Sequence, residues 1–110
     1  MPTDTKRNRG DIGSIMVIAS VPFLGNFEFH VHTLTDQYIS RNLLHEKIWE
    51  PFETKIFCRL CMDGDFVVDL GANIGWYSVI ASQLVGATGR VFSFELDSTN
   101  LELLRRNALG

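Results

Sequence analysis

The segment from Phe66 to Gly75, with the sequence FVVDLGANIG, most constrains how this chain can fold. Its first three residues are apolar, as expected for a parallel strand that is covered on both faces. Asp69 lies at the end of this strand. Gly71 and Gly75 follow in a turn where the backbone can bend sharply and approach a ligand closely. A helix after the turn would direct its first amide N–H groups toward that ligand. The pattern predicts an α/β fold with a binding loop between strand and helix.

The spacing of the glycines separates two classes of cofactor. The dinucleotide fingerprint G-x-G-x-x-G has a middle glycine that admits a pyrophosphate. Here that position is Asn73, which would crowd a pyrophosphate, and Asp69 would repel its charge. A cationic ligand with an amino group and a sulfonium suits Asp69 better, because the carboxylate can accept a charge-assisted hydrogen bond. S-adenosyl-L-methionine is such a ligand.

A second acidic residue follows at a suitable distance. The predicted strand over residues 90–95 ends at Glu95, close to the ~20-residue offset from the glycine loop at which a ribose-binding acid is expected. Two ribose hydroxyls can donate to one carboxylate. NAD is held by its ribose in the same way, so the preference for S-adenosylmethionine rests on Asp69 and the absent middle glycine.

At these residues the chain resembles a known family, the FkbM-type branch of class I S-adenosylmethionine-dependent methyltransferases. The resemblance is specific over residues 65–110 and weaker upstream. One departure follows Glu95, where the family usually has Glu-Pro-Asp-Pro and this chain has Glu-Leu-Asp-Ser, so that Ser98 and Thr99 are expected to cap the next helix. The matching segments are DLGANIGWYS (69–78), VFSFELD (91–97), Asn100 and LLRRN (103–107), with DQYIS (36–40) and WEP (49–51) upstream.

The resemblance implies a Rossmann-like class I methyltransferase fold, truncated after the second core strand and helix. We expect a flexible basic tail over residues 1–13, a β-hairpin and helical lead-in over 14–62, and the incomplete first half of the S-adenosylmethionine-binding domain over 63–110. The chain would then be a fragment or a truncated remnant. The first core strand, 66–70, would have one unpaired, exposed edge.

The resemblance also implies roles for individual residues. An acceptor oxygen would attack the sulfonium methyl in line, with S-adenosylhomocysteine as the leaving product. The acceptor would be a hydroxyl of a sugar, a lipid or a secondary metabolite, and no catalytic base is identified. The implied cofactor contacts are Asp69 to the methionine amino group, the backbone of Gly71, Ala72 and Asn73 to the methionine moiety, Gly75 in the turn, Glu95 to the ribose and Leu96 beside the adenine.

The upstream half predicts a hairpin and two helices. Residues 14–21 and 27–33 are strand-like and are joined by a loop that contains Pro22. In the second strand Phe27, Phe29 and Val31 would share one face and Glu28, His30 and His32 the other. A helix is expected from Asp36. Another is expected from Pro51 to about Cys61, with Phe52, Ile56, Phe57 and Leu60 on the side that packs against the cofactor sheet.

Several other residues could carry chemistry but have a simpler structural interpretation. Cys58 and Cys61 have metal-ligand spacing, yet zinc needs four ligands, and both lie near a predicted helix C-terminus, where thiol pKa values are not lowered. We therefore expect them to fill the core and predict no metal site. His30 and His32 are expected on a solvated polar face.

Three residues near the loop leave alternatives open. Trp76 and Tyr77 are expected to pack in the core, although either could border the methionine pocket. Glu50 either reaches the cofactor or acceptor site or is an ordinary exposed residue at a helix start.

Composition sets broad limits. The chain has 110 residues, 45% of them hydrophobic, and a net charge of −3, which fits one soluble globular domain and not a disordered or nucleic-acid-binding chain. No apolar run approaches the ~20 residues of a membrane span. A cytoplasmic location is expected. Two alternatives to a methyltransferase stay open: an NAD-dependent oxidoreductase, and an inactive remnant or interaction module.

Overall fold

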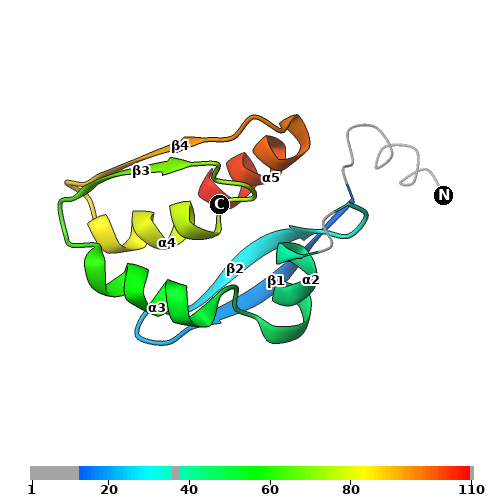
Figure 1. Cartoon of the computed structure of the whole chain (residues 1–110), viewed down its shortest axis with the longest axis horizontal. Coiled ribbons are helices and arrows are strands. Elements are labelled where there is room, and N and C mark those ends of the chain that lie inside the picture. Colours follow the sequence, from blue (N-terminus) through cyan, green and yellow to red (C-terminus); the bar gives the residue numbers. More distant parts are fainter. Residues whose placement is uncertain (1–12, 36–37, 110) are drawn as a thin grey trace.

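The computed structural model describes residues 13–35 and 38–109 as a small α/β molecule (Figure 1). The predicted basic tail up to residue 12 and the predicted helix start at Asp36 lie outside the described residues. The elements, in chain order, are β1 (Ser14–Val21), β2 (Gly25–His32), α2 (Ile39–Glu46), α3 (Pro51–Leu60), β3 (Phe66–Leu70), α4 (Trp76–Val85), β4 (Arg90–Phe94) and α5 (Ser98–Leu109).

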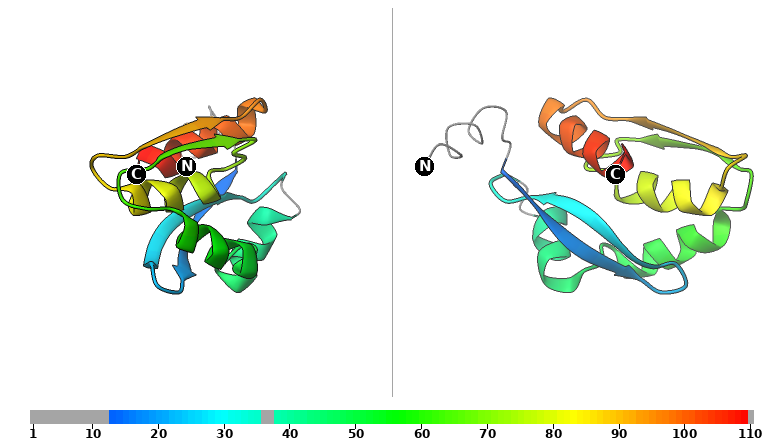
Figure 2. Two further views of the ribbon diagram at one scale, coloured as in Figure 1. Left: turned by 60° about the vertical axis from the view of Figure 1, so that its left-hand side comes forward. Right: turned by 180° about the vertical axis from the view of Figure 1, so that it is seen from behind.

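Two small sheets enclose a pair of helices. β1 and β2 form an antiparallel hairpin, and β3 and β4 form a parallel pair in which Asp69 lies opposite Ser93. Helices α4 and α5 lie between the two sheets, α2 packs on the hairpin, and α3 packs against α4 (Figures 1 and 2). The hairpin and the β3–α4–β4–α5 order therefore agree with the sequence prediction.

The core lies between the hairpin, α2 and the start of α4. Phe29 and Val31 are fully buried and Phe27 is partly buried, which confirms the predicted apolar face of β2. The Trp76 ring packs against Phe29 and Phe27, with centroid separations of 5.5 and 5.7 Å. Leu43 of α2 is also fully buried in this cluster. Trp76 is thus a core residue that joins the binding loop to the hairpin.

The prediction of a solvated face for His32 is wrong. His32 is only 1% exposed, because α5 and α2 cover this end of β2. Its backbone N–H donates to Ser40 Oγ at 2.8 Å, and its Nε2 donates to Asn100 Oδ1 at 2.9 Å. His30 is partly buried and Glu28 is exposed. The covering helix α5 is distant in sequence, so strand alternation alone could not indicate it.

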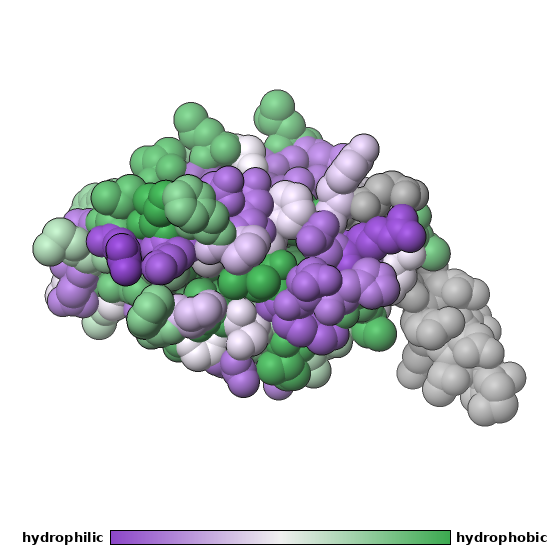
Figure 3. Space-filling model, turned by 60° about the horizontal axis from the view of Figure 1, so that its bottom comes forward, coloured by the Kyte–Doolittle hydropathy of each residue, from purple (hydrophilic) through white to green (hydrophobic). Residues whose placement is uncertain are grey.

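The predicted packing of α3 on the sheet is also wrong in part. Phe57 packs against the core and its ring lies 5.1 Å from that of Tyr77, whereas Phe52, Ile56 and Leu60 are exposed. Because α3 packs against α4, its apolar side borders an open cavity of about 360 Å³ next to β3. Hydrophobic side chains gather on the surface at the end of the molecule that carries α3 (Figure 3).

The N-cap of helix α5 differs from the expected one. Asp97 Oδ1 accepts hydrogen bonds from the backbone N–H groups of Thr99 and Asn100, at 2.8 and 3.1 Å. Asp97 thus caps the helix, and Ser98 is its first residue instead of the cap.

The β3–β4 sheet is covered on one face only. We use the term open sheet face for its five outward apolar side chains, which are all exposed. Within the described residues β3 pairs with β4 alone, so its other edge is unpaired, as the sequence predicts. No helix in the described ranges is long and apolar enough to cross a membrane. The open sheet face consists of Phe66, Val68, Leu70, Phe92 and Phe94.

Candidate cofactor-binding site

The loop between β3 and α4 has the left-handed backbone that its glycines suggest. Gly71, Asn73 and Gly75 have φ values of 72°, 56° and 101°. A Cβ at Gly75 would lie 2.7 Å from Leu104 Cδ1, so both conformation and space require glycine there. A Cβ at Gly71 would meet nothing within 4 Å, which leaves open space beside this part of the loop.

Most backbone N–H groups of the loop already have acceptors. Those of Gly71 and Ala72 both donate to the Phe94 carbonyl at 2.9 Å, and that of Gly75 donates to the Ala72 carbonyl at 2.9 Å. The N–H of Asn73 donates to Glu95 Oε1 at 2.6 Å. A pyrophosphate-binding loop needs such groups free for phosphate oxygens. The arrangement therefore disfavours a dinucleotide, in agreement with the absent middle glycine.

The structure brings Glu95 against the loop. Besides the contact with Asn73, the other carboxylate oxygen of Glu95 accepts the Asp97 N–H at 3.1 Å. These two bonds fix the carboxylate at the carboxyl end of β4. An ionised carboxylate has about four acceptor sites, so roughly two stay available to hydroxyl donors. Two adjacent hydroxyls of a ribose are donors of this kind.

Asp69 lies apart from the Glu95 contact. Its side chain is on the α4 face of β3, where Asp69 Oδ2 accepts a hydrogen bond from Ser78 Oγ at 2.7 Å. Ser78 Oγ is also 2.6 Å from Ser93 Oγ on β4. Ser78 is a residue whose role the sequence analysis missed. A hydroxyl in the first turn after a glycine loop, opposite a strand-end carboxylate, is a pattern that could have indicated it.

Two further residues of the predicted cofactor site, Leu96 and Asn73, could still make contacts with a ligand. Leu96 is fully exposed, directly after Glu95. Asn73 Oδ1 is buried and has no hydrogen-bond partner among the described residues. An unpaired buried acceptor carries a free-energy cost, which a hydrogen-bond donor from a ligand would remove.

Glu50 and Tyr77 form a pair beside the loop. The Tyr77 hydroxyl donates to Glu50 Oε1 at 2.7 Å. Burial and this bond to Glu50 raise the pKa of Tyr77 above its usual value, so the hydroxyl stays protonated and donating at neutral pH. Glu50 has a left-handed backbone, with φ of 45°. The partly buried Tyr77 is thus fixed by its hydrogen bond to Glu50. The same bond holds Glu50 next to α4, the helix that follows the loop.

The electrostatic character of the site follows from its residues. Asp69 and Glu95 contribute carboxylates and Asn73 contributes an amide oxygen, while residues 66–78 and 91–98 contain no Lys, Arg or His. This set of acceptors without cations suits a ligand that donates hydrogen bonds and carries positive charge.

The two cysteines lie away from this site. Cys58 and Cys61 are free and half-buried, and burial raises the pKa of both thiols, with Asp65 and Cys58 adding to the effect at Cys61. A raised pKa keeps a thiol protonated and poorly reactive. Within the described ranges no three His, Cys, Asp or Glu side chains are grouped closely enough to hold a metal ion.

Comparison with known proteins adds a partial similarity to a methyltransferase. No protein-family model and no solved structure matches the chain. A probable cobalt-precorrin-6B C(15)-methyltransferase (decarboxylating) from Saccharolobus solfataricus is 44% identical over 45 residues, which are 41% of this chain and 23% of that protein. The chain thus matches less than a quarter of the relative's length. This weak similarity supports a relationship to methyltransferases in general and does not distinguish among their types.

Proposed function

We propose that this chain carries the cofactor-binding part of an S-adenosylmethionine-dependent methyltransferase of the FkbM type. The observation that carries the proposal is the loop itself: the backbone N–H groups of Gly71, Ala72, Asn73 and Gly75 are bonded within the chain, the Asn73 bond being to Glu95. No cationic side chain is present in residues 66–78 or 91–98. A diphosphate would find few free N–H donors and no cationic side chain in these segments. A sulfonium with an amino group and ribose hydroxyls finds acceptors.

The residues fit this cofactor in three respects. Glu95 would hold the ribose hydroxyls through its unused acceptor sites, with exposed Leu96 beside the adenine. The open space next to Gly71 admits the close approach of a ligand to the backbone. The unpaired Asn73 Oδ1 and the Asp69 carboxylate are acceptors for an ammonium group.

The chemistry that S-adenosylmethionine supplies is an electrophilic methyl group. The chain's own residues would bind and orient it, and positioning alone can lower a barrier by ~7–11 kcal/mol. We propose O-methyl transfer to a hydroxyl of a sugar, a lipid or a secondary metabolite. The free thiols of Cys58 and Cys61 fit a cytoplasmic location, which we also propose.

The experiment compares two variants with the same loss of charge. Glu95→Gln keeps one oxygen for the Asn73 N–H but loses the charged acceptor for the ribose. Hydrogen bonds to charged groups contribute ~1.5–3 kcal/mol, so S-adenosylhomocysteine should bind roughly tenfold to a hundredfold more weakly. Glu102→Gln, at an exposed position on α5, is the matched control and should leave the affinity unchanged.

Calorimetric titration of both variants and of the unmodified chain would provide the affinities. Equal affinity of Glu95→Gln and the unmodified chain would refute the assignment of Glu95. If none of the three proteins bound S-adenosylhomocysteine, an inactive remnant or interaction module would become the better account.

A further inference from the structure

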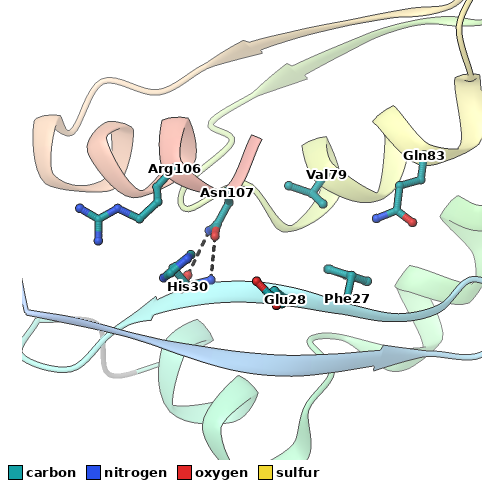
Figure 4. A pocket seen from close by; sticks show the side chains of 7 residues that line it. All are labelled: Phe27, Glu28, His30, Val79, Gln83, Arg106 and Asn107. Atoms are coloured by element: carbon teal, nitrogen blue, oxygen red, sulfur yellow. Dashed lines mark hydrogen bonds between the residues drawn. The ribbon is translucent and has the colours of Figure 1, made fainter. Parts of the chain in front are cut away.

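A buried amide side chain on α5 connects three parts of the molecule. Asn107 is 8% exposed and lies at the wall of a cavity between β2, α4 and α5 (Figure 4). Its Oδ1 accepts the His30 N–H at 2.7 Å. Its Nδ2 donates to the His30 carbonyl at 3.0 Å and to the Ile74 carbonyl at 2.8 Å. Both side-chain donors and the acceptor are therefore used, and only one orientation of the amide satisfies all three bonds.

The two bonds to His30 bind α5 to the outer edge of the hairpin. One residue of β2 gives its N–H and its carbonyl to the same side-chain amide, as it would to a neighbouring strand. Asn100, seven residues earlier on α5, contacts the next residue of the same strand face, His32. Asn100 and Asn107 thus both attach α5 to β2, and of the two it is Asn107 that also bonds to the loop.

The bond from Asn107 to the Ile74 carbonyl connects α5 to the loop between β3 and α4. The carbonyl of Ile74 belongs to the same peptide unit as the N–H of Gly75, which donates to the Ala72 carbonyl at 2.9 Å. This peptide is therefore fixed on both sides. Leu104 of α5 fills the space where Gly75 would carry a side chain. Two residues away, the N–H of Asn73 is fixed to Glu95. The loop is thus held at one end by Glu95 and at the other by Asn107.

We propose that Asn107 is a positioning residue for the binding loop, which sets the orientation of the peptide between Ile74 and Gly75 and so the shape that the cofactor meets. This inference rests on the proposed function of the loop. It assigns to α5 a role in ligand affinity as well as in stability, since the same side chain joins the loop to the β1–β2 hairpin.

The test compares Asn107→Ala with Asn100→Ala. Both variants lose a contact between α5 and the hairpin, so both should unfold at lower urea concentration. Only Asn107→Ala frees the Ile74 carbonyl, so its affinity for S-adenosylhomocysteine should fall roughly tenfold, while that of Asn100→Ala should stay within about twofold of the unmodified chain. If Asn107→Ala does not fold, Asn107→Leu is used, because its side chain fills the space of the amide, still frees the Ile74 carbonyl and should give the same ranking. Equal affinities of the two variants would overturn the proposal.

A second readout needs no ligand, and so separates this inference from the proposed function. Hydrogen exchange at the Gly75 amide should be at least tenfold faster in Asn107→Ala than in Asn100→Ala, at conditions where both are folded. A loss of Gly75 protection without any ligand binding would leave the positioning role standing and reject the cofactor. Unchanged protection of Gly75 in Asn107→Ala would reject the positioning role itself.

Discussion

Tyr77 provides a pH-dependent test at the scale of a single residue. Burial, then the bond to Glu50, raises its pKa above the ordinary value of 10.0. A raised pKa in the folded state means that the bond's contribution to stability is fully present below pH 10.0 and is lost as the pH rises from there through the folded-state pKa.

The prediction uses Tyr38→Phe, in which Tyr77 is the remaining tyrosine of the chain's two. Tyrosinate absorbance of this variant should appear only above pH 10.0 in the folded state and near pH 10.0 in urea. Adding Glu50→Gln should move the folded-state titration to lower pH, because the negative charge beside the hydroxyl is removed. A folded-state titration that matches the titration in urea would contradict the buried, bonded hydroxyl.

At the residue scale, the sequence predicted features that depend on residues close together in the chain. Gly71 and Gly75 have the left-handed backbone that a sharp turn requires. Glu95 accepts a hydrogen bond from the loop at Asn73, a contact that its predicted role in ribose binding did not specify. The burial of His32 depends on a partner from α5, which is far away in sequence. The periodicity within β2 separates an apolar face from a polar face, but it cannot show that a helix distant in sequence covers the polar one.

At the scale of elements, one buried hydroxyl joins α3 to α4. Thr54 is 1% exposed; its Oγ1 donates to the Trp49 carbonyl at 2.7 Å and accepts from Trp76 Nε1 at 2.9 Å. Thr54→Val preserves the shape but leaves a buried donor and a buried carbonyl unpaired. The free energy of unfolding should fall by about 2 kcal/mol or more.

Urea unfolding, followed by Trp fluorescence, would measure this loss. Thr54→Ser is the matched control, since it keeps the hydroxyl and loses only a methyl group, which costs about 1 kcal/mol. A valine variant as stable as the serine variant would show that the hydroxyl does not join the two helices.

Element positions were predictable where apolar periodicity is strong. Strand β3 begins and ends at the expected residues, and the alternation in β2 identified its core face. Helix α3 was placed correctly, but its packing was not: Ile56 and Leu60 border an open cavity beside β3, and Phe52 is exposed. An amphipathic pattern indicates that a helix has an apolar side, but it does not indicate which element packs against that side.

At the scale of the whole molecule, the open sheet face is the largest departure from a closed core. Strands of parallel sheets are normally covered on both faces, and a large exposed apolar patch promotes association or dye binding. The chain alone should therefore bind the dye ANS and associate as its concentration rises.

The double variant Val68→Thr with Phe92→Thr should reduce both effects and change the free energy of unfolding by less than ~1 kcal/mol, because both side chains are exposed. Leu109→Thr, at an exposed apolar residue on α5, is the control and should change neither. Sedimentation velocity over a range of concentrations would measure the association. Unchanged association in the double variant would show that a different surface mediates self-association. The exposed side of α3 would then be tested next.

The central claim is that the loop between β3 and α4 binds a sulfonium nucleoside and not a dinucleotide. The most direct measurement is a pair of calorimetric titrations of the unmodified chain, one with S-adenosylhomocysteine and one with NADH, at the same pH and salt concentration. The account predicts saturable one-to-one binding of S-adenosylhomocysteine and no binding of NADH, because the site offers carboxylates, most N–H groups of its loop are already bonded, and its two segments have no cationic side chain for a diphosphate. Binding of NADH without binding of S-adenosylhomocysteine would contradict it.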